Sequence, residues 1–276
     1  MDFVKPLPAY LIQRYHGWFA TGFSQNQAWY KRLATEGQRP RAMIISCCDS
    51  RVHATSIFGA EQGEFFIHRN IANLVPPYSP DGSQHGTSAA VEYAVTALNV
   101  SQLIILGHSN CGGVKGCLDM CRGHAPQLEE KTSFVGRWMD ILRPGYEAIK
   151  DYSSEEEIAQ DLEKQAVLTS LTNLMTFPFV EKAVQDGSLS LHGLWTDIGE
   201  GSLEAFDPAS QKFKPVEAFQ NIIEQKTHFR ARPRRRTLIF AACLRGKRLT
   251  LRYRFAFVSA ARSQYLRFKY PAKIDI

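Results

Sequence analysis

The chain has 276 residues, of which 44% are hydrophobic and 22% are charged, and this balance excludes a mostly disordered protein. No apolar run approaches the roughly 20 residues that a membrane span needs, and residues 1–8 lack the segments of a secretory signal. We therefore expect a globular, cytoplasmic protein without a membrane span, in one large domain or two small ones. The net charge of +6 is uneven, because residues 228–276 carry +13 and the rest carry −7.

The first 37 residues predict a helical arm. Apolar side chains recur there at steps of three and four residues, namely Tyr10, Leu11, Tyr15, Trp18 and Phe19, followed by Trp29, Tyr30 and Leu33. Gly37 is the expected end of the second stretch. An arm this apolar is too hydrophobic to lie free on a monomer, so we expect at least a homodimer.

Three short apolar runs follow, at 42–46, 65–67 and 103–106. Such runs are typical of strands buried on both faces of a parallel sheet. A helix is expected over about 87–98, and the order strand, helix, strand indicates an α/β fold. Further on, Ser154 and Glu157 form a capping-box pattern that opens a helix of about 20 residues. A β-hairpin is expected from strands at 189–195 and 202–206.

Polar clusters end two of these strands. Residues 47–51 (CCDSR) follow the first strand, and residues 108–113 (HSNCGG) end the third. Active sites of open parallel sheets form beyond the carboxyl ends of the strands, so the two clusters can converge. Thiolate and imidazole groups are favoured zinc ligands, and three ligands with one open position make a catalytic zinc site. The candidate ligands are Cys47, His108 and Cys111.

Asp49 is the candidate for a fourth contact, either as a direct zinc ligand or as the acceptor of a hydrogen bond from zinc-bound water. Arg51 lies two residues further along, on the same side of an extended segment, and can clamp that carboxylate with two hydrogen bonds. Cys48 is expected to face the core, opposite Cys47, as a small apolar residue. Cys117 and Cys121 lie one helical turn apart, and a buried structural role is expected for them.

Three motifs, in this order and spacing, resemble the β-class carbonic anhydrases: residues 47–52 (CCDSRV), 68–73 (HRNIAN) and 107–113 (GHSNCGG). Residues 92–95 and 195–201 also resemble that family, and the likeness spans about residues 5–225. It implies a mostly parallel central sheet with an antiparallel edge strand, flanked by helices, in a domain over 1–227. Its N-terminal helical arm, residues 1–37, would embrace a partner subunit. One Zn²⁺ per chain would bind Cys47, His108 and Cys111.

The family has two variants of the zinc site. In the open, plant-like variant Arg51 would hold Asp49 away from the metal, whereas in the closed variant Asp49 would complete the zinc site. Ile44 and Ser46 stand where the closed variant has Trp and Gly, and Gln38 matches the open variant, so we expect the open site. Its substrate pocket would comprise Gln38, Phe66, Ile71, Tyr93 and Gly112, and in this variant Gln38, Phe66 and Tyr93 reach the zinc pocket of the partner subunit.

The resemblance implies reversible hydration of carbon dioxide to bicarbonate and a proton. Zinc-bound hydroxide, oriented by the Asp49–Arg51 dyad, would attack the substrate. Two alternatives stay open: hydrolysis of COS or CS2 on the same fold, and a non-enzymatic protein with a structural zinc site. The expected partners are CO2 or bicarbonate and a second copy of the chain, as a homodimer or higher homo-oligomer, and no membrane.

Residues 228–276 lie beyond the resemblance and form a basic C-terminal extension with 11 Arg, 3 Lys and 1 Asp. An apolar run at 237–244 and alternating residues from 249 to 257 predict an amphipathic β-hairpin. We expect an appended segment without a catalytic role. The alternatives are an anionic partner, either nucleic acid or a membrane surface, and an altered reading frame. The extension is the only feature that suggests nucleic acid, which is not an expected partner of the protein.

Overall fold

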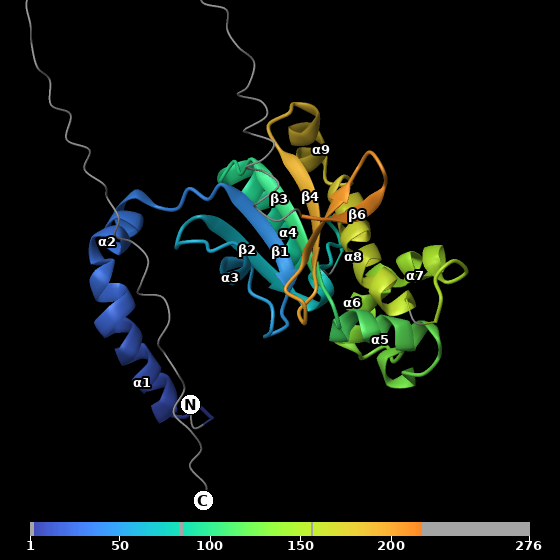
Figure 1. Ribbon diagram of the computed structural model, residues 1–276, viewed down its shortest axis with the longest axis horizontal. Coiled ribbons are helices and arrows are strands. Elements are labelled where there is room, and N and C mark those ends of the chain that lie inside the picture. Colours follow the sequence, from blue (N-terminus) through green and yellow to red (C-terminus); the bar gives the residue numbers. More distant parts are fainter. Residues whose placement is uncertain (1–2, 83–84, 156, 217–276) are drawn as a thin grey trace, which may run out of the picture. The chain divides into compact units, whose positions relative to one another are not determined.

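The computed structural model describes residues 3–82, 85–155 and 157–216. The predicted basic extension at 228–276 lies outside the described residues. Within them, six strands form one sheet in the order β2-β1-β3-β4-β5-β6 (Figure 1). The strands are β1 (Ala42–Cys47), β2 (Phe65–Asn70), β3 (Gln102–His108), β4 (Ser190–Thr196), β5 (Leu203–Asp207) and β6 (Lys212–Pro215).

The sheet is parallel over β2, β1, β3 and β4, and antiparallel where β5 joins β4 and where β6 joins β5. The expected mixed sheet with an antiparallel edge is therefore confirmed, and so is the β4–β5 hairpin. The short strand β6 was not predicted. It is mostly exposed and carries no continuous apolar run, so its sequence lacks the pattern on which strand prediction depends.

Helices surround the sheet. The α-helices are α1 (Ala9–Trp18), α2 (Gln27–Glu36), α3 (Ala54–Ile57), α4 (His85–Glu92), α5 (Gly112–Cys121), α6 (Phe134–Met139), α7 (Arg143–Ile149), α8 (Ile158–Leu174) and α9 (Pro178–Gln185). Shorter 3-10 or π segments are η1 (Phe19–Phe23), η2 (Ile71–Asn73), η3 (Tyr93–Ala97), η4 (Pro126–Leu128) and η5 (Asp140–Leu142). None of the described helices is long and apolar enough to cross a membrane.

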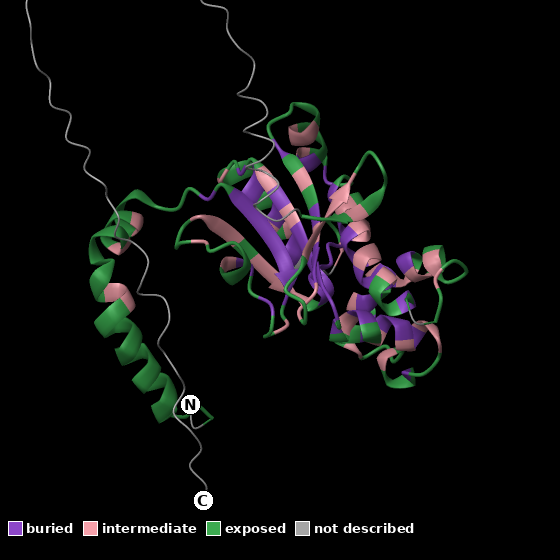
Figure 2. Ribbon diagram, viewed as in Figure 1, coloured by how far each residue is buried: buried purple, intermediate pink, exposed green. Residues whose placement is uncertain are grey.

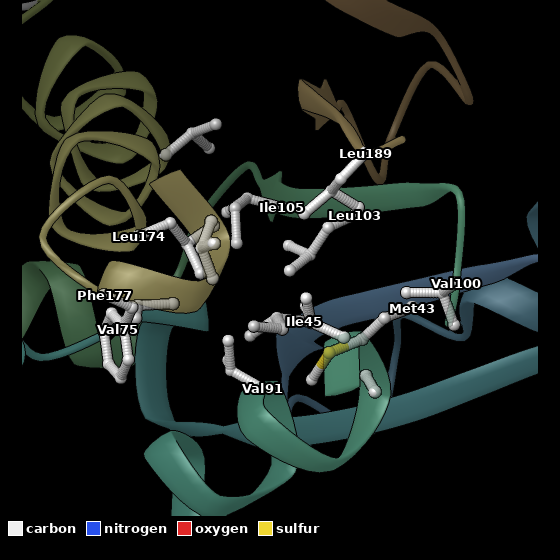
Figure 3. Packing of buried hydrophobic residues seen from close by; sticks show 14 residues of the cluster. Met43, Ile45, Val75, Val91, Val100, Leu103, Ile105, Leu174, Phe177 and Leu189 are labelled. Atoms are coloured by element: carbon white, nitrogen blue, oxygen red, sulfur yellow. The ribbon is translucent and has the colours of Figure 1, made fainter. Parts of the chain in front are cut away.

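Alternating residues of the central strands pack on opposite faces of the sheet. Met43 and Ile45 of β1 and Ile105 of β3 belong to a core that Val91 of α4 and Leu174 of α8 complete (Figure 3). Ile44 and Leu106 point the other way, into a second cluster with Val52 and Ala54. Burial of β1 on both faces is thus confirmed, whereas the expectation is wrong for β2, which is only half-buried because it is an edge strand (Figure 2).

The first described helices have no such core. Neither α1 nor α2 contains a buried residue, and Figure 2 shows both mostly exposed. Tyr10, Tyr15 and Trp18 are 58%, 54% and 44% exposed. The predicted helical arm is present and ends at Gly37, which has a φ of 74°, but it begins at Ala9, and residues 4–8 are not helical.

Helix α8 begins later than the sequence predicted. Ser154 Oγ accepts a hydrogen bond from the Glu157 N–H at 3.3 Å, as in a capping box, but the regular helix starts at Ile158. Two glycines bring α8 close to the sheet: a Cβ on Gly107 would lie 2.7 Å from Val167 Cγ2, and one on Gly193 would lie 2.9 Å from Leu171 Cδ1. This close approach places the first turns of α8 beside the end of β3.

Candidate metal centre and active site

The ends of β1 and β3 bring the three candidate ligands together. Cys47 ends β1, His108 ends β3, and Cys111 precedes the first turn of α5. Because β1 and β3 are parallel neighbours with Ser46 opposite Leu106, their carboxyl ends meet. Ligand atoms of all three residues lie within 4.8 Å of one another, and all three residues are buried. The sequence prediction that these residues converge is confirmed.

The orientation of His108 leaves one ring nitrogen available to a cation. Its Nδ1 lies 2.9 Å from the Ser109 carbonyl oxygen, and only a protonated nitrogen can donate to that acceptor. The other nitrogen, Nε2, then carries a lone pair. Nε2 is buried and has no hydrogen-bond partner among the described residues. A buried polar atom without a partner is costly, and a metal ion in the cluster would satisfy it.

The two sulfur atoms have the spacing of a tetrahedral zinc site. Cys47 Sγ lies 3.9 Å from Cys111 Sγ. Two Zn–S bonds of about 2.3 Å at a tetrahedral angle place the sulfurs about 3.8 Å apart. The hydrogen bond between the two sulfurs holds the pKa of Cys47 well below its usual range, which favours the thiolate form that binds a cation. The donor set and its spacing therefore fit zinc.

Asp49 stands next to this cluster but is tied to Arg51. Arg51 Nε donates to Asp49 Oδ1 at 2.9 Å and Arg51 Nη2 donates to Oδ2 at 2.7 Å. The same Nη2 donates to the Asn110 carbonyl at 3.0 Å, just before the ligand Cys111. The Arg51 hydrogen bond holds the pKa of Asp49 well below its usual range. Asp49 is therefore ionised at neutral pH and held in a fixed direction.

Arg69 fixes the backbone of this segment, a contribution that the sequence reasoning missed. Its guanidinium donates to the carbonyl oxygens of Cys47, Asp49 and Val52 at 2.8, 2.7 and 2.9 Å. The only signal in the sequence was its place in the second motif, 68–73. One side chain from β2 thus holds the chain that carries both a ligand and the Asp–Arg pair.

Glu163 of α8 also contacts the site and was not predicted. It is 6% exposed. Its Oε1 accepts a hydrogen bond from the Cys111 N–H at 3.1 Å, and its Oε2 accepts one from Trp195 Nε1 at 3.2 Å. Burial raises the pKa of Glu163, against the effect of these two donors. A signal existed in the sequence, since Glu163 shares a helical stripe with the apolar residues Ala166 and Val167.

The structure divides the predicted pocket residues into two groups. Ile71 packs against the start of α5, where a Cβ on Gly113 would lie 2.6 Å from Ile71 Cγ2. Gly112 borders open space, because a Cβ there would meet no atom within 4 Å. Phe66 and Tyr93 form a separate ring pair with centroids 5.8 Å apart. Gln38 is exposed in the segment between α2 and β1.

The remaining cysteine predictions have mixed outcomes. Cys48 is exposed, so the expectation that it faces the core is wrong. Its physical reason is that β1 ends at Cys47, and the alternation of an extended strand ends with it. Cys117 is buried in α5, as expected, and Cys121 on the next turn is half-buried.

Comparisons with known proteins agree with this geometry. The family model for carbonic anhydrase matches residues 42–203. Beta carbonic anhydrase 3 of Arabidopsis thaliana is 39% identical over 202 residues, covering 71% of this chain and 74% of the relative. The solved structure of the β-carbonic anhydrase CcaA matches with a TM-score of 0.68 and 32% identity, over 76% of this chain and 92% of that one.

A structure from the fungus Sordaria macrospora, one of two described as tetrameric β-carbonic anhydrases, matches with a TM-score of 0.58 and 28% identity. It covers 76% of this chain and 96% of the other. The match to the family model spans both strand ends that carry the Cys–His–Cys cluster. The chain therefore belongs to the β-class carbonic anhydrases, a family of zinc-dependent enzymes that hydrate carbon dioxide.

Proposed function

We propose that Cys47, His108 and Cys111 hold one zinc ion per chain and that Asp49 and Arg51 orient the oxygen that attacks carbon dioxide. The observation that carries this proposal is the convergence of three buried ligand atoms within 4.8 Å, next to a carboxylate that Arg51 already holds. When bound, zinc lowers the pKa of a coordinated water toward about 7, so that a nucleophile is available near neutral pH.

The Asp49–Arg51 pair favours the open form of the site. Both Asp49 oxygens accept hydrogen bonds from Arg51, and the carboxylate does not belong to the group of converging ligand atoms. An ionised carboxylate accepts hydrogen bonds and cannot donate one. Asp49 therefore accepts a hydrogen bond from the attacking water or hydroxide. This hydrogen bond directs a lone pair of the attacking oxygen toward the substrate.

An apolar side chain and backbone donors lie together at the start of α5, next to Cys111. Ile71 presents an apolar surface beside α5, which suits a small apolar gas. The Gly113 N–H faces the Cys111 sulfur. The Gly112 N–H belongs to the first turn of α5, where the positive end of a helix favours an anion such as bicarbonate. Substrate and product thus meet different chemistry in one small space.

Phe66 and Tyr93 support a site completed by a second copy of the chain. In the parallel register of β1 and β2, Cys47 lies opposite Asn70 whereas Met43 lies opposite Phe66. Four residues of strand separate them, about 13 Å at 3.3 Å per residue. Tyr93 is 49% exposed and contacts Phe66. We propose that this pair, with Gln38, lines the zinc pocket of the partner subunit.

The exposed helical arm supports the same assembly. Helices α1 and α2 bury none of their residues, although the arm carries many aromatic side chains. Replacing Tyr15 and Trp18 by Ser should lower the mass measured by light scattering to that of a monomer. A monomeric wild-type enzyme with full activity would contradict this part of the proposal.

The function itself is tested by zinc content and gas-specific activity of the purified protein. We expect one zinc per chain and rapid CO2 hydration. His108→Ala should lose both zinc and activity. His192→Ala is the control and should lose neither, because His192 is exposed and forms a hydrogen bond with Gln102. Faster turnover of COS or CS2 than of CO2 would show a hydrolase. Zinc binding without activity toward any of these gases would show a structural site.

A further inference from the structure

Glu163 is a buried acid that the chemistry proposed above leaves unused. Its two carboxylate oxygens have different partners: Oε1 accepts from the Cys111 N–H at 3.1 Å, and Oε2 accepts from Trp195 Nε1 at 3.2 Å. Cys111 is a proposed zinc ligand, whereas Trp195 lies in β4. The side chain thus connects a proposed ligand to a neighbouring strand.

The two donors require a carboxylate at this position. Each N–H needs its own acceptor, because a buried donor without a hydrogen-bond partner is destabilising. A glutamine has the same size but offers one carbonyl oxygen, and its amide group would face one of the two donors. An acid at position 163 therefore has a specific chemical reason that packing alone does not supply.

Trp195 is itself fixed by its surroundings, so its Nε1–H group donates to Glu163 from a fixed position. It is 1% exposed, and Lys164 Nζ lies 4.7 Å from the centre of its ring. Lys164 is fixed in turn by an ion pair with Glu204 of β5 at 2.8 Å. Consecutive residues of α8 therefore hold Trp195 by its N–H edge and by its face.

The absence of a side chain at Gly107 lets Glu163 lie this close to the cluster. A Cβ on Gly107 would lie only 2.7 Å from Cγ2 of Val167, one turn beyond Glu163 on α8, so a side chain at position 107 would push this part of α8 away. Gly107 directly precedes His108. The first turns of α8 therefore contact the segments that carry two of the three proposed ligands.

We propose that Glu163 is a positioning residue of the metal site: it fixes the Cys111 peptide so that Cys111 Sγ already lies beside Cys47 and His108 before zinc binds. This inference rests on the zinc ligands proposed above. Changes to residues that orient metal ligands typically weaken metal binding about 10- to 100-fold, and we expect an effect of this size.

The test is a set of zinc dissociation constants measured by chelator competition on the full chain. Glu163→Gln should weaken zinc binding about 10- to 100-fold. Trp195→Phe should leave it close to that of the wild-type protein, because the Cys111 hydrogen bond remains. The double variant should bind zinc more tightly than Glu163→Gln, since one carbonyl oxygen then serves one donor. Glu181→Gln, an exposed acid of α9, is the control for loss of charge.

Spectra of the cobalt-substituted protein give a second readout that a packing defect alone would not follow. The ligand-field bands should shift in Glu163→Gln and return toward the wild-type position in the double variant. Unchanged zinc affinity in Glu163→Gln, or a double variant no better than the single one, would overturn the inference. If Glu163→Gln does not fold, the zinc affinity of the double variant is compared with that of Trp195→Phe. An affinity of the double variant that is 10-fold or more weaker would overturn the inference. Failure of the wild-type protein to bind zinc would instead overturn the proposed ligand set.

Discussion

Substitution of Arg51 by lysine should separate catalysis from metal binding and from stability. Arg51 donates three side-chain hydrogen bonds, two to Asp49 and one to the Asn110 carbonyl. Lysine keeps the positive charge but cannot donate the two parallel hydrogen bonds of a guanidinium group to the Asp49 carboxylate. It can therefore no longer hold both Asp49 oxygens, and misplacing a reacting group by about 1 Å costs up to about 100-fold in rate. We expect kcat/KM for CO2 hydration to fall by that factor.

Removal of the whole side chain should have a larger effect on the same step. A positioned acid or base group contributes about 10²- to 10⁴-fold, so Arg51→Ala should approach this loss. Stability should change little, because the Arg51 side chain is 50% exposed and exposed ion pairs contribute little to stability. Zinc content should stay at one per chain, since neither Asp49 nor Arg51 is a proposed ligand.

The assay is stopped-flow CO2 hydration, with zinc content and urea unfolding measured on the same samples. The ratio kcat/KM is the relevant quantity because kcat also contains product release. Arg143→Lys is the matched control: Arg143 also contacts two carboxylates, Glu129 and Asp140, at 2.8 and 3.0 Å, away from the cluster. Full activity of Arg51→Lys and Arg51→Ala would refute the role of the dyad. Loss of zinc from Asp49→Ala would show the closed site instead.

Three further outcomes follow from the described contacts. Gly107→Ala should lower the free energy of unfolding of the metal-free protein by about 1–3 kcal/mol, because the new Cβ would overlap the buried Val167. Gly86→Ala is the control, since its Cβ would enter open space and should cause no such loss. Equal urea midpoints for the two variants would contradict the packing argument. Burial lowers the pKa of His68, so the unfolded chain binds a proton more readily than the folded one, and stability should fall as the pH drops below about 6.5. The melting temperature of His68→Gln should therefore depend less on pH between about pH 7.5 and 5.5. An equal dependence in the wild-type protein and the variant would contradict this. Deletion of residues 228–276 should leave zinc binding and CO2 hydration nearly intact, since every residue of the predicted site lies between 38 and 112. A truncated protein that folds but is inactive would show that part of the site was misplaced.

Most of the sheet could be predicted from the sequence because β1, β2 and β3 contain short continuous apolar runs, whereas β4 alternates apolar residues with others. The zinc cluster could be predicted because Cys47, His108 and Cys111 follow directly on two such runs, and parallel neighbours end at the same edge. The Asp49–Arg51 contact is local and followed from a spacing of two residues.

Other features depend on contacts that no local pattern contains. Glu163 reaches Cys111 because α8 approaches the sheet at glycines far away in the sequence. Cys48 was misplaced because the strand ends one residue earlier than an alternating pattern implies. The helices α6 and α7 were not predicted, since they are short and several of their apolar residues are exposed, including Phe134 at 83%.

We propose that CO2 hydration takes place at zinc held by Cys47, His108 and Cys111. This is tested by titrating the metal-stripped full chain with zinc and measuring the rate of CO2 hydration at each step. The rate should rise in proportion to bound zinc and level off at one zinc per chain. A rate independent of zinc, or one that levels off at a different stoichiometry, would contradict it.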